Sequence, residues 1–402
     1  MEAPAWRREV GAPRIAFAGL TGPAQVGVGL TAPMGGADMA ECTRWVGLDV
    51  HLHQTACAVV DTQGGEVWQR TLTGGSAPLI RWLSGLERPW RGVYEAGPTG
   101  YTLARRAAEV GLEVAVCAPG HLGRSGQERI TTDARDALRL ARLLAAGELT
   151  LVHVPSEADE HLRDLVRARE DVRGDLMRAR HRIGKLLMRR EVHYPGPRGA
   201  WTQAHLDWLG AVRLDDEASE VVLADYLHHH QVLVARRARL DQAIAELGAC
   251  SHLAATIARL RCLRGIDTLS AAGLACEVAD FARFGHPEQL AAYLGLVPSA
   301  HDSGLRRRAG AITKAGSRHA RRPLVEAAWH YRRPPRVSGE LARRQAGQEP
   351  WAVDCAWRAR RRLHRRWQSL HTHRGLKGGV VAVAVARELS HFVWELGQGA
   401  RT

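Results

Sequence analysis

Two runs of heptad-like repeats occupy the middle of this 402-residue chain and limit the folds open to it. Apolar or long side chains recur about every 3.5 residues, the spacing of two long helices packed along a narrow seam. The first run comprises Leu162, Leu165, Arg169, Val172, Leu176, Ala179, Ile183 and Leu186. The second comprises Val222, Tyr226, His229, Leu233, Arg236, Leu240, Ala243 and Leu247. With the link YPGPRG between them, they predict an antiparallel coiled-coil arm over residues 157–250.

The segment before this arm alternates strand-like and helix-like patterns. Three β segments followed by a βαβα pattern predict an α/β domain over residues 44–150, in which helices cover a mixed sheet. The expected strands lie near residues 44–50, 54–61, 66–72, 91–95 and 113–117. The expected helices lie near residues 77–86, 99–110 and 133–146.

The segment after the arm predicts a mostly α C-terminal domain over residues 252–396. It opens with a helix, a glycine turn and a helix in LRCLRGIDTLSAAGLACEVADFARF. This pattern is similar to a helix-hairpin-helix, whose turn amides contact a phosphate backbone, and a simple αα-turn fits it equally well. The stretch that follows, which contains HDSGLRRRAGAITKAG, is dense in Gly, Ser and Arg. Residues 332–375 are basic and contain Trp, and a last helix is expected near residues 377–396.

The first 40 residues differ from the rest of the chain. They are rich in Gly, Ala and Pro and lack periodicity, a composition that cannot support a core. We expect either a disordered tail over residues 1–40 or an extension that precedes a true translation start at Met39.

Cysteine usage and hydropathy favour a cytoplasmic protein. The seven cysteines are odd in number and form no CxxC pair, which argues for reduced thiols and against a zinc site. No apolar run approaches the roughly 20 residues of a membrane span, so no membrane association is expected. We interpret the run His228, His229 and His230 as surface, because successive helical residues do not share a face.

The chain carries a net charge of +14, from 56 Lys and Arg against 42 Asp and Glu. Such a surplus points to a polyanionic partner, most often DNA or RNA, although a basic protein without a specific partner would have the same composition. Arg crowds the outer positions of the expected arm. That face is either solvated or lies along nucleic acid.

Four carboxylates of the α/β domain fall in the pattern of a metal-dependent nuclease core. Asp49 and Glu95 end strands. Asp133 and Asp136 lie three residues apart at the start of a helix. Two-metal phosphodiester chemistry needs several carboxylates around ions such as Mg²⁺ or Mn²⁺, and strand ends of open α/β sheets gather functional groups. Each residue alone also has a structural explanation: Asp133 and Asp136 would complement the positive end of a helix capped by Thr132, and Glu95 would be an exposed turn residue.

A second candidate site lies in HDSGLRRRAGAITKAG, where Ser303 precedes Gly304. A nucleophilic serine in phosphoryl transfer requires positive charge around the scissile phosphate. The alternative is a Ser-Gly turn that only binds phosphate together with its arginines. The expected phosphate contacts are Arg306, Arg307, Arg308, Lys314, Arg318 and Arg321.

The ordered combination of motifs resembles the DEDD transposases of the IS110 insertion-sequence family, which includes the pilin-gene invertases. The resemblance spans roughly residues 44–396. It rests on GLDVH, YEAGPTGY, TTDARDALRLARLL, RGIDTLSAAGLACEVADFARF, LAAYLGLVPS and DSGLRRRAGAITKAGSRHARRPLVEAAW. Two positions depart from the family pattern: Thr131 stands where the family often has Lys, and Asp302 where it usually has a second Ser.

The resemblance implies a RuvC-like, RNase H-type domain, a coiled-coil linker and a C-terminal transposase domain. It implies Mg²⁺ at the four carboxylates and a serine that forms a covalent phosphoserine with DNA. We place that serine at Ser303 and keep Ser299 and Ser317 as open alternatives. It also implies a structured guide RNA from the flanking non-coding region, a homodimer or tetramer with composite sites, and action at the bacterial nucleoid.

We therefore expect an insertion-sequence transposase or site-specific recombinase that cleaves and rejoins DNA strands. Two alternatives stay open. A junction-type or structure-selective endonuclease would use the carboxylates alone and leave Ser303 idle. A non-catalytic, nucleic-acid-binding transposon remnant would be indifferent to the loss of Asp49.

Overall fold

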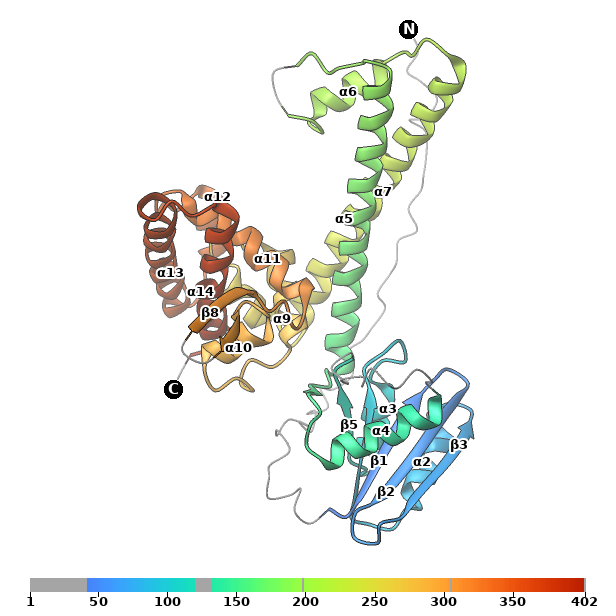
Figure 1. Ribbon diagram of the computed structural model, residues 1–402. Helices are drawn as coiled ribbons and strands as arrows, with labels where there is room; N and C mark the ends of the chain where they lie inside the picture. The colour runs from blue at the N-terminus through green and yellow to red at the C-terminus, as the bar shows by residue number, and fades with distance from the viewer. Residues whose placement is uncertain (1–41, 120–131, 197–198, 304–305, 401–402) are drawn as a thin grey trace.

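The computed structural model describes residues 42–119, 132–196, 199–303 and 306–400, and the side chains of residues 300–309 lie outside this description. The expectations for the first 40 residues, a disordered tail or a start at Met39, fall outside the described residues. The described part comprises a sheet unit, a two-helix arm and a helical unit (Figure 1).

The sheet unit contains six strands in the order β3-β2-β1-β4-β5-β6. Its strands β1, β2 and β3 are antiparallel, β1, β4 and β5 are parallel, and β6 is antiparallel to β5. This mixed sheet, followed by a mostly helical region, fits an RNase H-like domain. The elements are β1 Arg44–Val50, β2 Gln54–Asp61, β3 Val67–Thr73, α2 Ser76–Ser84, β4 Trp90–Glu95, α3 Thr102–Glu109, β5 Val114–Cys117, α4 Asp133–Ala145 and β6 Leu151–Val152.

The two faces of the sheet are covered by different helices, as the alternation of side chains along β1 requires. Val46 and Leu48 point to one face and pack in a core with residues of α2 and α3. Trp45 points to the other face and packs against Leu140 and Leu144 of α4. Helix α4 therefore lies across the same face of the sheet as Trp45, Gly47 and Asp49 of β1.

The arm consists of α5 Glu157–Arg189 and α7 Glu217–Cys250, which lie side by side, with α6 Gln203–Ala211 at the far end (Figure 1). Both long helices begin with a side-chain cap, from Ser156 and Asp216 respectively. Coiled-coil packing of this pair stays a prediction. The expected seam positions of α5 that are buried are Leu162, Val172, Leu176, Ala179, Ile183 and Leu186.

The seam of α7 differs by one residue from the expected one in its first half. Leu223 and His230 are buried there, whereas Val222 and His229 are exposed. The interpretation of all three histidines as surface residues was therefore wrong for His230, which is only 3% exposed. Its ring stacks on Trp201 at a centroid distance of 5.0 Å, so the chain around α6 adds a second partner that a two-helix pattern does not contain.

The helical unit follows the arm and shares one core with its base. A two-stranded antiparallel hairpin, β7–β8, interrupts it where sequence reasoning expected no strands. The elements are α8 Ala254–Leu260, α9 Thr268–Val278, α10 Pro287–Tyr293, β7 Pro298–Ser303, β8 Arg306–Ile312, α11 Arg318–Ala328, η2 Trp329–Arg332, α12 Gly339–Gln345, α13 Pro350–Gln368, η3 Ser369–His373 and α14 Gly378–Gln398. None of the described helices is long and apolar enough to cross a bilayer.

The first turns of α5 join both units. Arg105 of α3 pairs with Glu160 and also donates to the carbonyl oxygen of Pro155 at 3.1 Å. On the other side, Arg167 makes two bonds to the buried carboxylate of Glu277 in α9, at 2.8 and 3.2 Å. Arg163 donates to the Cys276 carbonyl oxygen at 2.8 Å. A bidentate arginine–carboxylate pair fixes orientation as well as distance.

Candidate active site

The approach of α4 to β1 is set by Gly47. A Cβ on this residue would lie 1.9 Å from the carbonyl oxygen of Ala137 and 2.5 Å from the amide nitrogen of Ala141. Only a residue without a side chain allows a helix backbone to come this close to a strand. Asp49 lies two residues further along the same face of β1, so the contact brings the first turn of α4 toward it.

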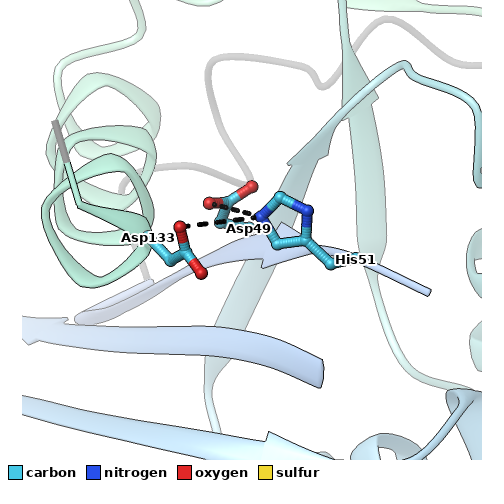
Figure 2. Close-up of side chains that lie close together, drawn as sticks. All are labelled: Asp49, His51 and Asp133. Carbon is cyan, nitrogen blue, oxygen red and sulfur yellow. Dashed lines mark hydrogen bonds and ion pairs between the residues drawn. The ribbon is translucent and has the colours of Figure 1, made fainter. Parts of the chain in front are cut away.

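Asp49, His51 and Asp133 form a cluster at this point (Figure 2). The His51 Nε2 atom lies 3.2 Å from Asp49 Oδ2 and 3.8 Å from Asp133 Oδ1. One potential ligand atom from each residue falls within 4.8 Å of the others. The structure thus brings together two of the four expected carboxylates and adds a histidine that the sequence interpretation missed.

The start of α4 is held in place by side chains of the antiparallel strands. Gln54 Nε2 donates to Asp133 Oδ2 at 3.1 Å, and Gln69 Nε2 donates to the Ala134 carbonyl oxygen at 3.0 Å. Thr132 occupies the N-cap position, but its side chain makes no capping hydrogen bond. Asp133 is therefore oriented by a contact to the sheet.

Glu95 is placed next to Asp49 by strand register. Leu48 of β1 pairs with Tyr94 of the parallel strand β4, so Asp49 and Glu95 follow at the carboxyl ends of adjacent strands. Side chains in register on neighbouring strands point to the same face. Glu95 is exposed, and neither it nor Asp136 belongs to the cluster of described ligand atoms.

The carboxylates of this cluster influence one another. Burial raises the pKa of Asp49 above its ordinary value; the charge and hydrogen bond of His51 oppose this rise, and the negative charges of Asp133 and Asp136 add to it. Asp136 is thus electrostatically part of the site. A concentration of partly buried negative charge beside a nitrogen donor suits a divalent metal ion.

The second candidate residue, Ser303, ends strand β7. It pairs with Arg306 at the start of β8, and Asp302 pairs with Arg307. The base of this hairpin is tied down, because Thr313 N donates to the Val297 carbonyl oxygen at 2.9 Å.

The two alternative serines are engaged in structural contacts. Ser299 Oγ donates to the Ala311 carbonyl oxygen at 3.1 Å. Ser317 caps α11 by accepting from the amide of Ala320, and its Oγ donates to Glu277 Oε2 at 2.9 Å. These hydroxyls have roles in the hairpin and the helix start respectively.

The expected phosphate contacts surround the hairpin and its exit. Arg306, Arg307 and Arg308 lie in β8. Lys314 follows in a left-handed backbone conformation, with φ of 56°. Arg318 begins α11, and the Arg321 guanidinium donates to the carbonyl oxygen atoms of Leu294 and Ala315 at 2.9 and 3.1 Å.

Known proteins resemble this chain along most of its length. A model described as the transposase IS116/IS110/IS902 family matches residues 257–340, and a DEDD transposase model of IS110 type matches residues 46–190. The putative transposase y4qE of Sinorhizobium fredii is 38% identical over 98% of this chain and 97% of its own. The chain belongs to the IS110 family of transposases. The transposase for insertion sequence element IS1533 of Leptospira borgpetersenii is 30% identical over 82% of this chain and 97% of its own.

Members of the IS110 transposase family cleave and rejoin DNA, and this chain is such an enzyme. The DEDD model spans the sheet unit and α5, so it includes Asp49, Glu95, Asp133 and Asp136. The second model spans the chain from α8 into α12 and includes the hairpin with Ser303. The two candidate sites of the IS110 transposase therefore lie in separately matched parts of the chain.

Proposed function

We propose that this transposase moves an insertion sequence with a RuvC-like domain over residues 44–150 whose carboxylates bind Mg²⁺ or Mn²⁺. The convergence of Asp49 and Asp133 at one end of the sheet carries this proposal. Glu95 and Asp136 complete the ligand set, Glu95 by its strand register and Asp136 by its charge at Asp49. Oxygen-rich donor sets are those that Mg²⁺ and Mn²⁺ prefer.

The protein groups of this site orient the scissile phosphate. A bound divalent ion would supply charge stabilisation to the phosphoryl oxygens. Gln54 and Gln69 keep the first turn of α4 against the sheet, which fixes the distance between the carboxylates of Asp133 and Asp49. His51 lies between these two carboxylates and offers an imidazole nitrogen to an ion or to substrate.

The nucleophile of the reaction is Ser303. Its Oγ forms a bond to the scissile phosphorus while the bond from phosphorus to the leaving sugar oxygen breaks. The serine proton is lost and the leaving oxygen gains one, which leaves a phosphoserine and a free DNA hydroxyl. Supporting this choice, Ser299 and Ser317 are committed to structural hydrogen bonds, and three arginines of β8 start opposite Ser303.

The two sets of proposed catalytic residues belong to different units of the chain: Figure 1 shows the sheet unit at the lower end of the arm and the helical unit beside the arm's lower half. We therefore propose that a complete site combines the carboxylates of one copy with the serine of another, in a homodimer or tetramer. The coiled-coil arm over residues 157–250 would join the copies, and residues 252–396 would form the transposase domain. A structured RNA encoded beside the gene would select the donor and target DNA, in keeping with the family resemblance.

The test is a covalent-trapping assay on denaturing gels. The protein, the RNA transcribed from the flanking region, Mg²⁺ and element-end DNA are combined, and the parent is compared with Asp49→Asn, Ser303→Ala and the control Ser299→Ala. We expect a protein–DNA adduct in the parent and the control. Both Asp49→Asn and Ser303→Ala should lower adduct formation at least about a thousandfold, the scale expected when an essential catalytic group is removed.

The outcomes separate the candidate functions. Cleavage without an adduct that survives Ser303→Ala but not Asp49→Asn would identify a nuclease that uses the carboxylates alone. Binding of DNA without any cleavage, unaffected by Asp49→Asn, would identify a non-catalytic protein.

A further inference from the structure

The arginines of the helical unit fall into two groups, one with carboxylate partners and one without. On one flank of α13, Arg358 pairs with Asp354 at 3.1 Å and with Glu395 of α14. Further along the same flank, Arg362 and Arg366 each lie 3.2 Å from Glu388. The positive charge of this flank is neutralised within the protein, so these arginines are structural.

A second group of arginines has no such compensation. Arg264, Arg332, Arg333 and Arg344, here called the arginine cluster, surround His330. Burial lowers the pKa of His330, and the positive charges of all four arginines lower it further. Among the described residues none of the four forms an ion pair. Arg264 donates to the carbonyl oxygen atoms of Arg333 and Pro334, and Arg344 donates to that of Ile266.

Three separate segments build the arginine cluster. Arg264 comes from the glycine turn between α8 and α9, Arg332 and Arg333 from the end of η2, and Arg344 from α12. The turn is pressed against the end of α11, since a Cβ on Gly265 would lie 2.9 Å from the Ala327 Cα. The turn expected to resemble a helix-hairpin-helix thus places a guanidinium beside three others.

A buried arginine lies behind the cluster. Arg360 of α13 is 1% exposed, and all three nitrogens of its guanidinium lack a hydrogen-bond partner. The positive charge of Arg264 and the hydroxyl of the buried Tyr331 both act on it electrostatically. Its guanidinium carbon lies 5.3 Å from the ring centroid of Trp357, a cation–π contact, but no carboxylate of the described residues pairs with it. A bound anion at the neighbouring arginine cluster would lower the cost of burying this charge.

From these observations we propose that the arginine cluster binds the phosphodiester backbone of duplex DNA, as a contact surface separate from the β7–β8 hairpin. Guanidinium groups match phosphate oxygens in a bidentate way, and four of them without internal carboxylate partners favour a polyanion. Contacts to phosphates carry no sequence information, so the surface would hold the DNA in place without reading bases. This inference rests on the proposed function, which supplies DNA as the polyanion.

The experiment measures how DNA affinity depends on salt. Each phosphate contact that is lost lowers the slope of log Kd against log salt concentration by about 0.9 on duplex DNA. The variant Arg332→Gln with Arg333→Gln removes two exposed guanidinium groups for which the structure records no side-chain bond. We expect its slope to fall by about 1.8, and the matching double substitution to Lys to retain most of the parent slope.

The control is Arg358→Gln with Arg362→Gln, which removes two arginines that internal carboxylates already neutralise. We expect its slope to stay within experimental error of the parent. Circular dichroism and urea unfolding of each variant confirm that binding is compared between folded proteins. The same titrations are repeated with a single-stranded RNA of the same length.

Three results would overturn the inference: an unchanged slope in the Arg332/Arg333 variant, an equal fall in the control, or a fall with RNA but not with DNA. If the parent protein forms the covalent DNA adduct while the variant keeps the parent slope, only the arginine cluster is refuted. If the parent neither binds DNA in a salt-dependent way nor forms the adduct, the proposed function fails with it.

Discussion

The carboxylate end of the sheet and the β7–β8 hairpin use the same device for different purposes. In both, a glycine fixes the backbone because its position has no room for a side chain. A Cβ on Gly47 would lie 1.9 Å from the carbonyl oxygen of Ala137, and a Cβ on Gly316 would lie 1.9 Å from that of Tyr293. At the sheet, the contact brings side chains of two elements together within one chain. At the hairpin, it anchors the base, from which β7 runs to Ser303.

The carboxylate cluster is therefore assembled when one chain folds, whereas the hairpin presents the proposed nucleophile, Ser303, to another molecule. The carboxylates need no other molecule to come together, because α4 is already held against the sheet by Gln54 and Gln69. In the function proposed above, the hairpin is the half of the reaction centre that DNA and a second chain complete.

The largest effect is expected in a mixture of two inactive variants. Asp49→Asn and Ser303→Ala should each be inactive alone. If the site is shared between copies, a mixed dimer contains one site with both the intact carboxylates and the intact serine. Strand cleavage should therefore reappear when the two proteins are refolded or co-expressed together.

The matched control for this mixture combines Asp49→Asn with Asp133→Asn. Both substitutions fall on the same half of the site, so no combination of copies restores it. Equal inactivity of the two mixtures would mean that carboxylates and serine act within one chain, and the contrast between the two regions would lose its functional meaning.

The next effect concerns the close contact of α4 and β1. Gly47→Ala forces a methyl group to within 1.9 Å of the Ala137 carbonyl oxygen, so the helix must move away from the strand. We expect the free energy of unfolding to fall by about 3 kcal/mol, the upper part of the range for overpacking. Urea unfolding followed by circular dichroism measures it, and strand cleavage should fall as well because Asp133 moves from Asp49.

The same substitution at Gly184 is the control. This glycine lies inside α5 with open space around its Cβ position. Alanine has the higher helix propensity by about 1 kcal/mol, so Gly184→Ala should stabilise the protein. Two destabilising substitutions of similar size would show that the Gly47 contact has no special role.

The smallest effect concerns the base of the arm, which connects the two regions. His252 Nε2 lies 3.2 Å from the buried Asp159, and this ion pair raises the pKa of His252. The stabilisation is full below the unfolded pKa of about 6.5 and is lost as the pH rises through the higher folded pKa. Because the pKa of Asp159 is lowered in the folded protein, its contribution disappears only in acid.

His252→Gln should therefore lower stability at pH 6 by less than about 1 kcal/mol, since the histidine is half exposed, and should have little effect at pH 9. Urea titrations at the two pH values test this. His161→Gln, whose ring lies 3.9 Å from the exposed Glu157, is the comparison variant with a smaller expected change. A loss of stability that is equal at both pH values would exclude the ion pair as its cause.

Much of the fold follows from local sequence patterns. The strands from β1 to β5 and helix α4 begin and end within one residue of the expected ranges, because alternating or heptad-spaced apolar residues record which face is buried. The hairpin was missed, since its Gly-, Ser- and Arg-rich segment has no apolar alternation. The one-residue shift in α7 also escaped prediction, because His230 is buried by Trp201, a residue outside the helix pair.

The candidate site was predictable in part for similar reasons. Asp49 and Asp133 were expected at one metal site together with Glu95 and Asp136, because functional groups gather at the strand ends of open α/β sheets and metal-dependent cleavage needs several carboxylates. His51 could have been predicted as a member of the site, since it lies two residues after Asp49 and residues two apart in an extended segment point to the same side. The role of Gly47 could not have been predicted, because a glycine in a strand does not reveal which backbone segment packs against it.

Helix α5 has a mechanical consequence that follows from its two attachments. Glu160 holds the sheet unit and Arg167 holds the helical unit, seven residues or about 10 Å apart on a helix about 50 Å long. Both units are thus clamped near one end of a single stiff rod. A partner bound at the far end, around α6, would be about the length of α5 away from both units. A rotation of α5 caused by that partner would therefore move the sheet unit and the hairpin together.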